Sequence, residues 1–169
     1  MVTVALIAVA VFAGGLVGWN VYQKHRAAAD RTAAQNLNEI GDARDDAGDV
    51  AGAEESYRLA IERDPRYALP YNNLGLLALR GGDVAEADSM FREAIERDPR
   101  YSTALVNLGN LYIDTRPDSA VALFRRALQG NDPAPAGNQL GYVMLRSGQL
   151  DEAHATLTAA LATPTTDDM

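Results

Sequence analysis

The sequence contains no cysteine, and only two of its 169 residues are histidine. The absence of cysteine excludes disulfides, thiol catalysis and cysteine-ligated metal sites, although it leaves the redox compartment open. His25 has no ligating partner near it in the sequence, and His154 stands far from it. We therefore predict no metal, no cofactor and no catalytic residue, and we interpret the protein as a non-enzyme.

Basic side chains are scarce as well, with 15 Lys and Arg against 23 Asp and Glu and a net charge of −8. An acidic chain repels a phosphate backbone, so we expect no nucleic-acid partner. The chain has no glycine-rich phosphate loop between a strand and a helix, and we expect no small-molecule substrate. Four acids, Asp42, Asp45, Asp46 and Asp49, fall along a helix and its turn rather than in a calcium loop, which predicts a solvated surface.

Charge is missing altogether from residues 1–19. The run Val2–Trp19 has Thr3 as its one polar residue, and continued to Tyr22 it would form a helix of roughly 31 Å at ~1.5 Å per residue. That length matches a hydrocarbon core of about 30 Å. We therefore predict a single transmembrane helix over residues 1–22.

The flank of this span fits a membrane interface. Trp19 and Tyr22 fall where an aromatic belt lies, and Lys24 and Arg26 follow in the headgroup zone. Residues 23–33 lack Pro and Gly and are expected to form a helical connector. Because Lys and Arg follow the span and none precedes it, the positive-inside rule favours a cytoplasmic C-terminal side, with a periplasmic side as the alternative.

Two alternatives concern the same segment. A cleaved signal peptide would use the small residues 27–29, but the apolar run is too long and basic residues stand between it and those alanines. Gly14, Gly15 and Gly18 lie close together in the span and could let another membrane helix approach its backbone. Glycine is also common in membrane helices, so this spacing could be accidental.

Beyond the connector, the sequence AIERDPRY occurs twice, at Ala60–Tyr67 and 34 residues later at Ala94–Tyr101. A fixed period of this length indicates stacked copies of one structural unit. Within each copy the Asp-Pro pair ends a helix, because proline lacks a backbone N–H and disfavours helix at the residue before it.

Each unit carries a Leu-Gly or Ile-Gly pair in a first helix and three spaced residues, small, large and small, in a second helix. The pairs are Ile40-Gly41, Leu74-Gly75, Leu108-Gly109 and Leu140-Gly141. The triplets are Ala53, Tyr57, Ala60; Ala87, Phe91, Ala94; Ala120, Phe124, Ala127; and Ala153, Leu157, Ala160. Small residues let two helices cross closely while the large residue fills the space beside them.

This pattern resembles the tetratricopeptide repeat family over four units, 34–67, 68–101, 102–133 and 134–167. The third unit departs from it, with Arg116-Pro117 where the other units have a glycine turn. The resemblance implies an all-α fold in which the transmembrane helix is followed by an α-solenoid of four antiparallel helix pairs, stacked in a right-handed superhelix. It also implies a concave face lined by the first helices and a role in protein binding.

Amides recur at positions expected to face that groove, where they could bond the backbone of an extended peptide. The predicted groove residues are Asn38, Asn72, Asn73, Leu76, Asn107, Asn110, Asn138, Gln139 and Tyr142. The alternative is that the amides join neighbouring helices inside the array. The basic residues that clamp acidic chaperone tails in some family members are absent, since Asn38, Asn72 and Val106 stand in their places.

We therefore interpret the protein as a membrane-anchored scaffold for protein–protein interaction. The more specific expectation is an accessory subunit of a larger bacterial membrane complex, of respiratory or photosynthetic type. Its partners would then be subunits of that complex and the lipid bilayer. The alternative is a transient assembly factor or chaperone-like adaptor that holds client peptides in the groove.

Overall fold

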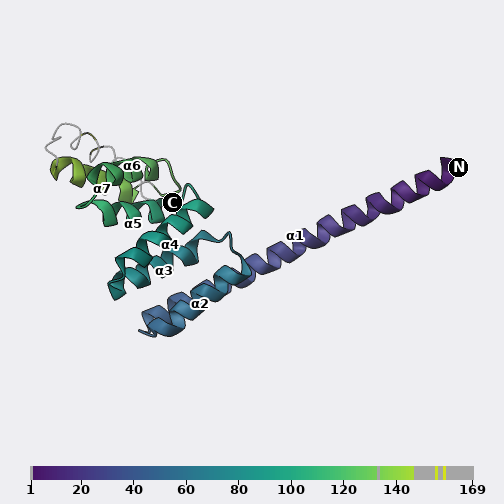
Figure 1. Ribbon diagram of the computed structural model, residues 1–169, viewed down its shortest axis with the longest axis horizontal. Helices are drawn as coiled ribbons and strands as arrows, with labels where there is room; N and C mark the ends of the chain where they lie inside the picture. Colours follow the sequence, from purple (N-terminus) through teal and green to yellow (C-terminus); the bar gives the residue numbers. More distant parts are fainter. Residues whose placement is uncertain (1, 133, 147–154, 156–157, 159–169) are drawn as a thin grey trace.

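The computed structural model describes residues 2–132, 134–146, 155 and 158, with the backbone alone for 2–18 and 134. This part of the chain is all-α and contains seven helices (Figure 1). The helices are α1 (Val2–Asp46), α2 (Val50–Arg63), α3 (Ala68–Gly81), α4 (Val84–Arg97), α5 (Ser102–Tyr112), α6 (Pro117–Ala127) and α7 (Ala134–Arg146).

The helices form hairpins that stack in chain order. The C-terminal part of α1 packs against α2, α3 packs against α4, and α5 packs against α6. Each hairpin also contacts the next one, and α7 continues the stack on α5 and α6. The predicted solenoid is therefore confirmed over these helices, while the second helix expected in the fourth unit lies outside the described residues apart from 155 and 158.

The Asp-Pro pairs and the turn glycines of the repeat produce the turns. α2 and α4 end before Asp64 and Asp98, whose backbones are extended because a proline follows each of them. Gly48 and Gly82 turn the chain between the helices of a pair at φ of 80° and 85°, a region that other residues rarely adopt. The aspartate after each glycine then caps the second helix, as in the 2.9 Å bond from Glu86 N to Asp83 Oδ1.

The core of each hairpin is a glycine pressed against an aromatic ring. A Cβ added at Gly41 would lie 2.5 Å from Tyr57 Cε1, and one at Gly75 would lie 2.6 Å from Phe91 Cε1. Gly109 meets Phe124 in the same way. The flanking alanines of the triplets in the first three units are completely buried. The small-to-large contact that the sequence predicted is thus present in all three pairs that the structure describes.

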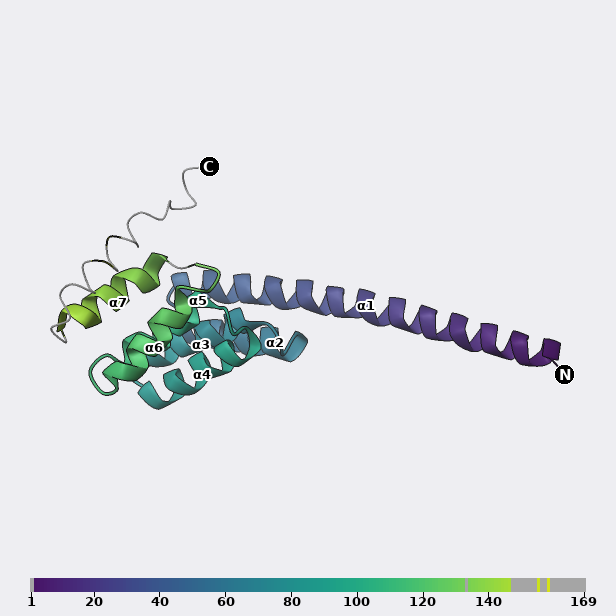
Figure 2. The ribbon, with the colours of Figure 1, turned by 90° about the horizontal axis from the view of Figure 1, so that it is seen from above.

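Helix α1 is one unbroken helix of 45 residues that extends far beyond the stack (Figures 1 and 2). It runs through the predicted span, the predicted connector and the start of the first unit. Among the residues whose side chains are described, no helix has the combination of length and apolar character that crossing a membrane requires. The side chains of residues 2–18 of the predicted span, with Gly14, Gly15 and Gly18, lie outside that described set.

A polar contact fixes α1 to the first repeat junction. Arg31 Nη1 donates to Asp64 Oδ2 over 2.9 Å, and its guanidinium lies 4.1 Å from the centroid of the Tyr67 ring. Burial raises the pKa of Asp64, but the bonds from Arg31 and from the Arg66 backbone outweigh it and hold that pKa below the usual value. Arg31 stands three residues before Ala34, the first fully buried residue of the array, so the contact extends the packed part of α1.

Candidate protein-interaction surface

Four of the amides predicted for the groove, Asn38, Asn72, Asn73 and Asn107, form bonds between neighbouring first helices. Asn38 and Asn72 are 1% and 2% exposed. Asn73 Nδ2 donates to Asn38 Oδ1 over 3.2 Å, which joins α3 to α1. Asn107 Nδ2 donates to Asn72 Oδ1 over 2.9 Å, which joins α5 to α3. These bonds therefore join the first three units to one another. That the same residues contact a partner stays a prediction.

Asp42 accepts hydrogen bonds at the α1 end of this row of amides. It receives hydrogen bonds from Tyr57 OH at 2.8 Å, Asn73 Nδ2 at 2.9 Å and Asn38 Nδ2 at 3.0 Å. Burial and the bond to Asp42 raise the pKa of Tyr57, which keeps its hydroxyl a donor. The Asp42 carboxylate thus bonds to side chains inside the array and is not a free acid.

Other side chains of the first helices are exposed at equivalent positions of the stack. Leu79 of α3 and Leu145 of α7 occupy the same place in the repeat, and they are 39% and 45% exposed. Leu76, Asn110 and Tyr142 occupy a second equivalent place and are also exposed. We call the surface formed by Leu76, Leu79, Asn110, Tyr142 and Leu145 the first-helix face.

The two remaining predicted groove residues, Asn138 and Gln139, lie on α7 and are exposed and half-buried, respectively. Ion pairs border the first-helix face and again join neighbouring units. Arg80 Nη2 lies 2.6 Å from Asp45 Oδ2, and Arg146 Nη1 lies 2.7 Å from Asp114 Oδ1. A partner on this face would meet apolar side chains between paired charges.

The predicted membrane-interface residues are exposed on the protruding part of α1. The rings of Trp19 and Tyr22 stack with centroids 5.7 Å apart. Lys24 is exposed, and Arg26 pairs loosely with Asp30 at 3.8 Å. Their arrangement brings the aromatic pair and the basic residues onto adjoining turns of one helix.

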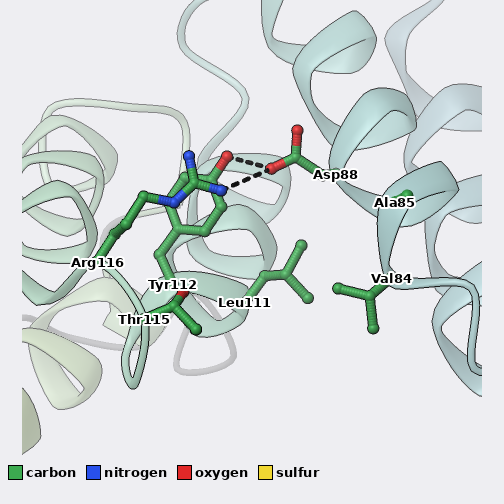
Figure 3. Close-up of a pocket in the computed structure, with 7 residues that line it drawn as sticks. All are labelled: Val84, Ala85, Asp88, Leu111, Tyr112, Thr115 and Arg116. Carbon is green, nitrogen blue, oxygen red and sulfur yellow. Dashed lines mark hydrogen bonds and ion pairs between the residues drawn. The ribbon is translucent and has the colours of Figure 1, made fainter.

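The part of the chain that the structure describes holds no group of three or more acids or histidines placed to bind a metal ion. It does contain a cleft that the sequence did not predict. The cleft has a volume of about 660 Å³, and Figure 3 shows α4 facing the end of α5 and the following turn across it. Its lining residues are Val84, Ala85, Asp88, Leu111, Tyr112, Thr115 and Arg116.

A charged cluster forms one wall of this cleft. Tyr112 OH donates to Asp88, and Arg92 Nε donates to the other oxygen of that carboxylate over 2.6 Å. The guanidinium of Arg116 lies 3.7 Å from the centroid of the Tyr112 ring and 3.6 Å from Asp88 Oδ1 (Figure 3). The one sequence signal for this site was the break in the repeat at Arg116-Pro117.

The stacked hairpins and their glycine–aromatic contacts define an α-helical repeat solenoid. The family model of the tetratricopeptide repeat matches residues 38–88 and 72–137, which together make up more than half of the chain. The chain belongs to the tetratricopeptide repeat family. A comparison with curated proteins gave no match.

Solved structures share the fold at low sequence identity. The structure of Pseudomonas aeruginosa pilF is 21% identical with a TM-score of 0.70, covering 79% of this chain and 62% of that one. PilW, described as a widely conserved type IV pilus biogenesis factor, is 22% identical with a TM-score of 0.67, covering 76% and 61%. YrrB, described as a TPR protein with an unusual peptide-binding site, is 23% identical with a TM-score of 0.61, covering 73% and 65%. The chain thus spans less than two thirds of each of these proteins.

Proposed function

We propose that the protein is a scaffold that binds another protein through the first-helix face. The observation that carries this proposal is the recurrence of exposed apolar side chains at equivalent positions of two first helices, Leu76 and Leu79 on α3 and Tyr142 and Leu145 on α7. Exposed apolar side chains that gather on one surface mark interaction sites, whereas scattered ones need no explanation. Solvation alone gives no reason for leucine at both Leu79 and Leu145.

We further propose that α1 anchors this scaffold in a membrane. The support is the uncharged run 2–19, the exposed pair of Trp19 and Tyr22, and the basic residues Lys24 and Arg26 that follow. The array then lies on the side of the bilayer that carries the basic flank, which we assign to the cytoplasm. Protease digestion of the array in inverted but not in intact vesicles would support this side, and the reverse would place the array in the periplasm.

The partner would be a larger bacterial membrane complex, of respiratory or photosynthetic type, in which the protein is an accessory subunit. An anchored repeat array suits bracing or positioning of other subunits. Such a subunit should be recovered with its complex in a fixed ratio after mild detergent extraction.

The test compares surface leucines of similar exposure. The double variant Leu79→Ser, Leu145→Ser removes two apolar contacts from the first-helix face. Leu59→Ser alters a leucine of α2 that is 40% exposed but lies on a second helix. If the face binds the partner, the double variant should lose at least tenfold in partner recovery at about 1 kcal/mol or more per contact, while Leu59→Ser retains it. Equal recovery from both would contradict the proposal.

A second candidate function is a transient assembly factor that holds client segments on the same face. It is favoured by the likeness to a pilus biogenesis factor and to a protein with a peptide-binding site. The two functions differ in stoichiometry. Recovery far below one copy per partner, and loss of the interaction once assembly is complete, would favour the assembly factor.

A further inference from the structure

The cleft between α4 and α5 occupies a place that recurs in the stack. A smaller cleft of about 230 Å³ lies between α2 and α3, where Val50 and Glu54 stand at the positions of Val84 and Asp88. The cleft at the α4–α5 junction is nearly three times larger, about 660 Å³, which is in the range of small ligand sites. The α4–α5 junction is therefore more open than the equivalent junction between α2 and α3.

The larger cleft lies at the break in the repeat. At the turn of the third unit, Arg116 occupies the N-cap place that Asp49 and Asp83 occupy in the first two units, and it makes no capping bond with its side chain. Tyr112 replaces the equivalent Ala78 of α3. The arginine side chain lies instead across the Tyr112 ring, at 3.7 Å from its centroid.

Two arginines share one carboxylate at this rim: Arg116 lines the cleft, and Arg92 lies behind it on α4. Asp88 is the one carboxylate of the cleft, and Arg92 and Arg116 both pair with it, at 2.6 Å and 3.6 Å. Burial raises the pKa of Asp88, but the bonds from Tyr112 and Arg92 outweigh it and hold that pKa below its usual value. One carboxylate thus faces two guanidinium groups, and the side chain of Arg116 is 54% exposed.

The other wall of the cleft is apolar. Val84, at the start of α4, is 53% exposed although it lies beside Ala85 and across from Leu111 (Figure 3). Thr115 closes the wall at the turn. An aliphatic group would bury this surface, and a carboxylate beside it would meet the exposed guanidinium of Arg116.

We propose that this cleft binds a segment of a partner protein that presents an aliphatic side chain followed by a carboxylate. The aliphatic side chain packs against Val84 and Leu111, and the carboxylate accepts from Arg116. The site shares no residue with the first-helix face, so it provides a second contact and does not depend on that face.

The test uses the full-length protein in detergent micelles, with labelled methyl groups observed by NMR. The probe is the blocked peptide acetyl-Gly-Leu-Glu-Gly-amide, and the matched peptide carries Gln in place of Glu. The Glu peptide should shift the methyl signals of Val84 and Leu111 at millimolar concentration. The Gln peptide should bind roughly threefold more weakly, as expected for one exposed ion pair.

Variants assign the two parts of the site. Arg116→Gln should remove the preference for Glu over Gln, and Val84→Glu should abolish the shift at Leu111. Arg63→Gln, an exposed arginine of α2 outside the cleft, should change neither result. Because Val84 is half exposed, its variant is expected to fold, which circular dichroism checks. Equal binding of the two peptides, or shifts confined to Leu79 and Leu145, would overturn the proposal.

Discussion

Single glycines decide how closely the two helices of each unit approach. At Gly41, Gly75 and Gly109, the space that a side chain would occupy is filled by a ring from the second helix. The rings are those of Tyr57, Phe91 and Phe124, respectively. These rings are the largest fully buried side chains of their pairs. The packing of each hairpin therefore depends on a glycine, because the neighbouring ring occupies the space that a side chain would need.

Gly75→Ala should destabilise the array by about 1–3 kcal/mol, since the new methyl would overlap the Phe91 ring. Gly81→Ala is the matched control, because nothing lies within 4 Å of its Cβ position at the end of the same helix. Urea unfolding followed by circular dichroism measures both. Equal stability of the two variants would show that the glycine–aromatic contact does not limit the approach of α3 and α4.

Asp64 links stability to pH. Its pKa in the folded protein is held below 3.8, so its contribution is complete above pH 3.8 and is lost as the pH falls through the lower, folded-state value. Asp64→Asn should therefore be less stable than the parent protein at pH 7, and the difference should shrink below pH 3.8. Urea midpoints across this range measure it. A difference that stays constant with pH would contradict the assigned ion pair with Arg31.

At the scale of elements, α1 is both the first helix of the array and the protruding helix. Its 45 residues include no break between these two parts. Arg31 holds it to Asp64 and Tyr67 outside the first hairpin. A continuous, clamped helix fixes the direction in which the array is presented, whereas a glycine linker would leave that direction free.

This rigidity is measurable with a pair of spin labels, which the cysteine-free sequence makes simple to place. Labels at Gln23→Cys and Glu62→Cys should give a single narrow distance distribution. Adding Ala28→Pro should broaden it, because proline in a helix interior costs about 3 kcal/mol and kinks or breaks the helix. A distribution that is already broad without the proline would mean that α1 bends between its two parts.

The elements of the array were predictable because their signals are local. Asp64 and Asp98 stand before prolines and end α2 and α4, and the glycine turns at Gly48 and Gly82 separate the helices of a pair. The roles of Asn38 and Asn72 were not predictable, because an amide can bond a peptide or a neighbouring helix equally well. The cleft at Arg116 depends on where α4 and α5 meet, which the spacing of residues along the chain does not specify.

At the scale of the whole molecule, some side chains join the units of the stack and others are exposed on its surface. Asn73, Asn107, Arg80 and Arg146 each bond to the preceding unit, so they stabilise the solenoid. The first-helix face, whose residues other than Asn110 are Leu or Tyr, remains exposed beside these bonds. The central proposal is that this face contacts a protein partner.

Site-specific cross-linking in native membranes tests this proposal most directly. A photoreactive amino acid at position 76 or 142 places the probe on the first-helix face, and the same probe at position 59 places it on α2. We predict that positions 76 and 142 cross-link one partner protein and that position 59 does not. Cross-links of equal yield from all three positions, or from position 59 alone, would contradict the account.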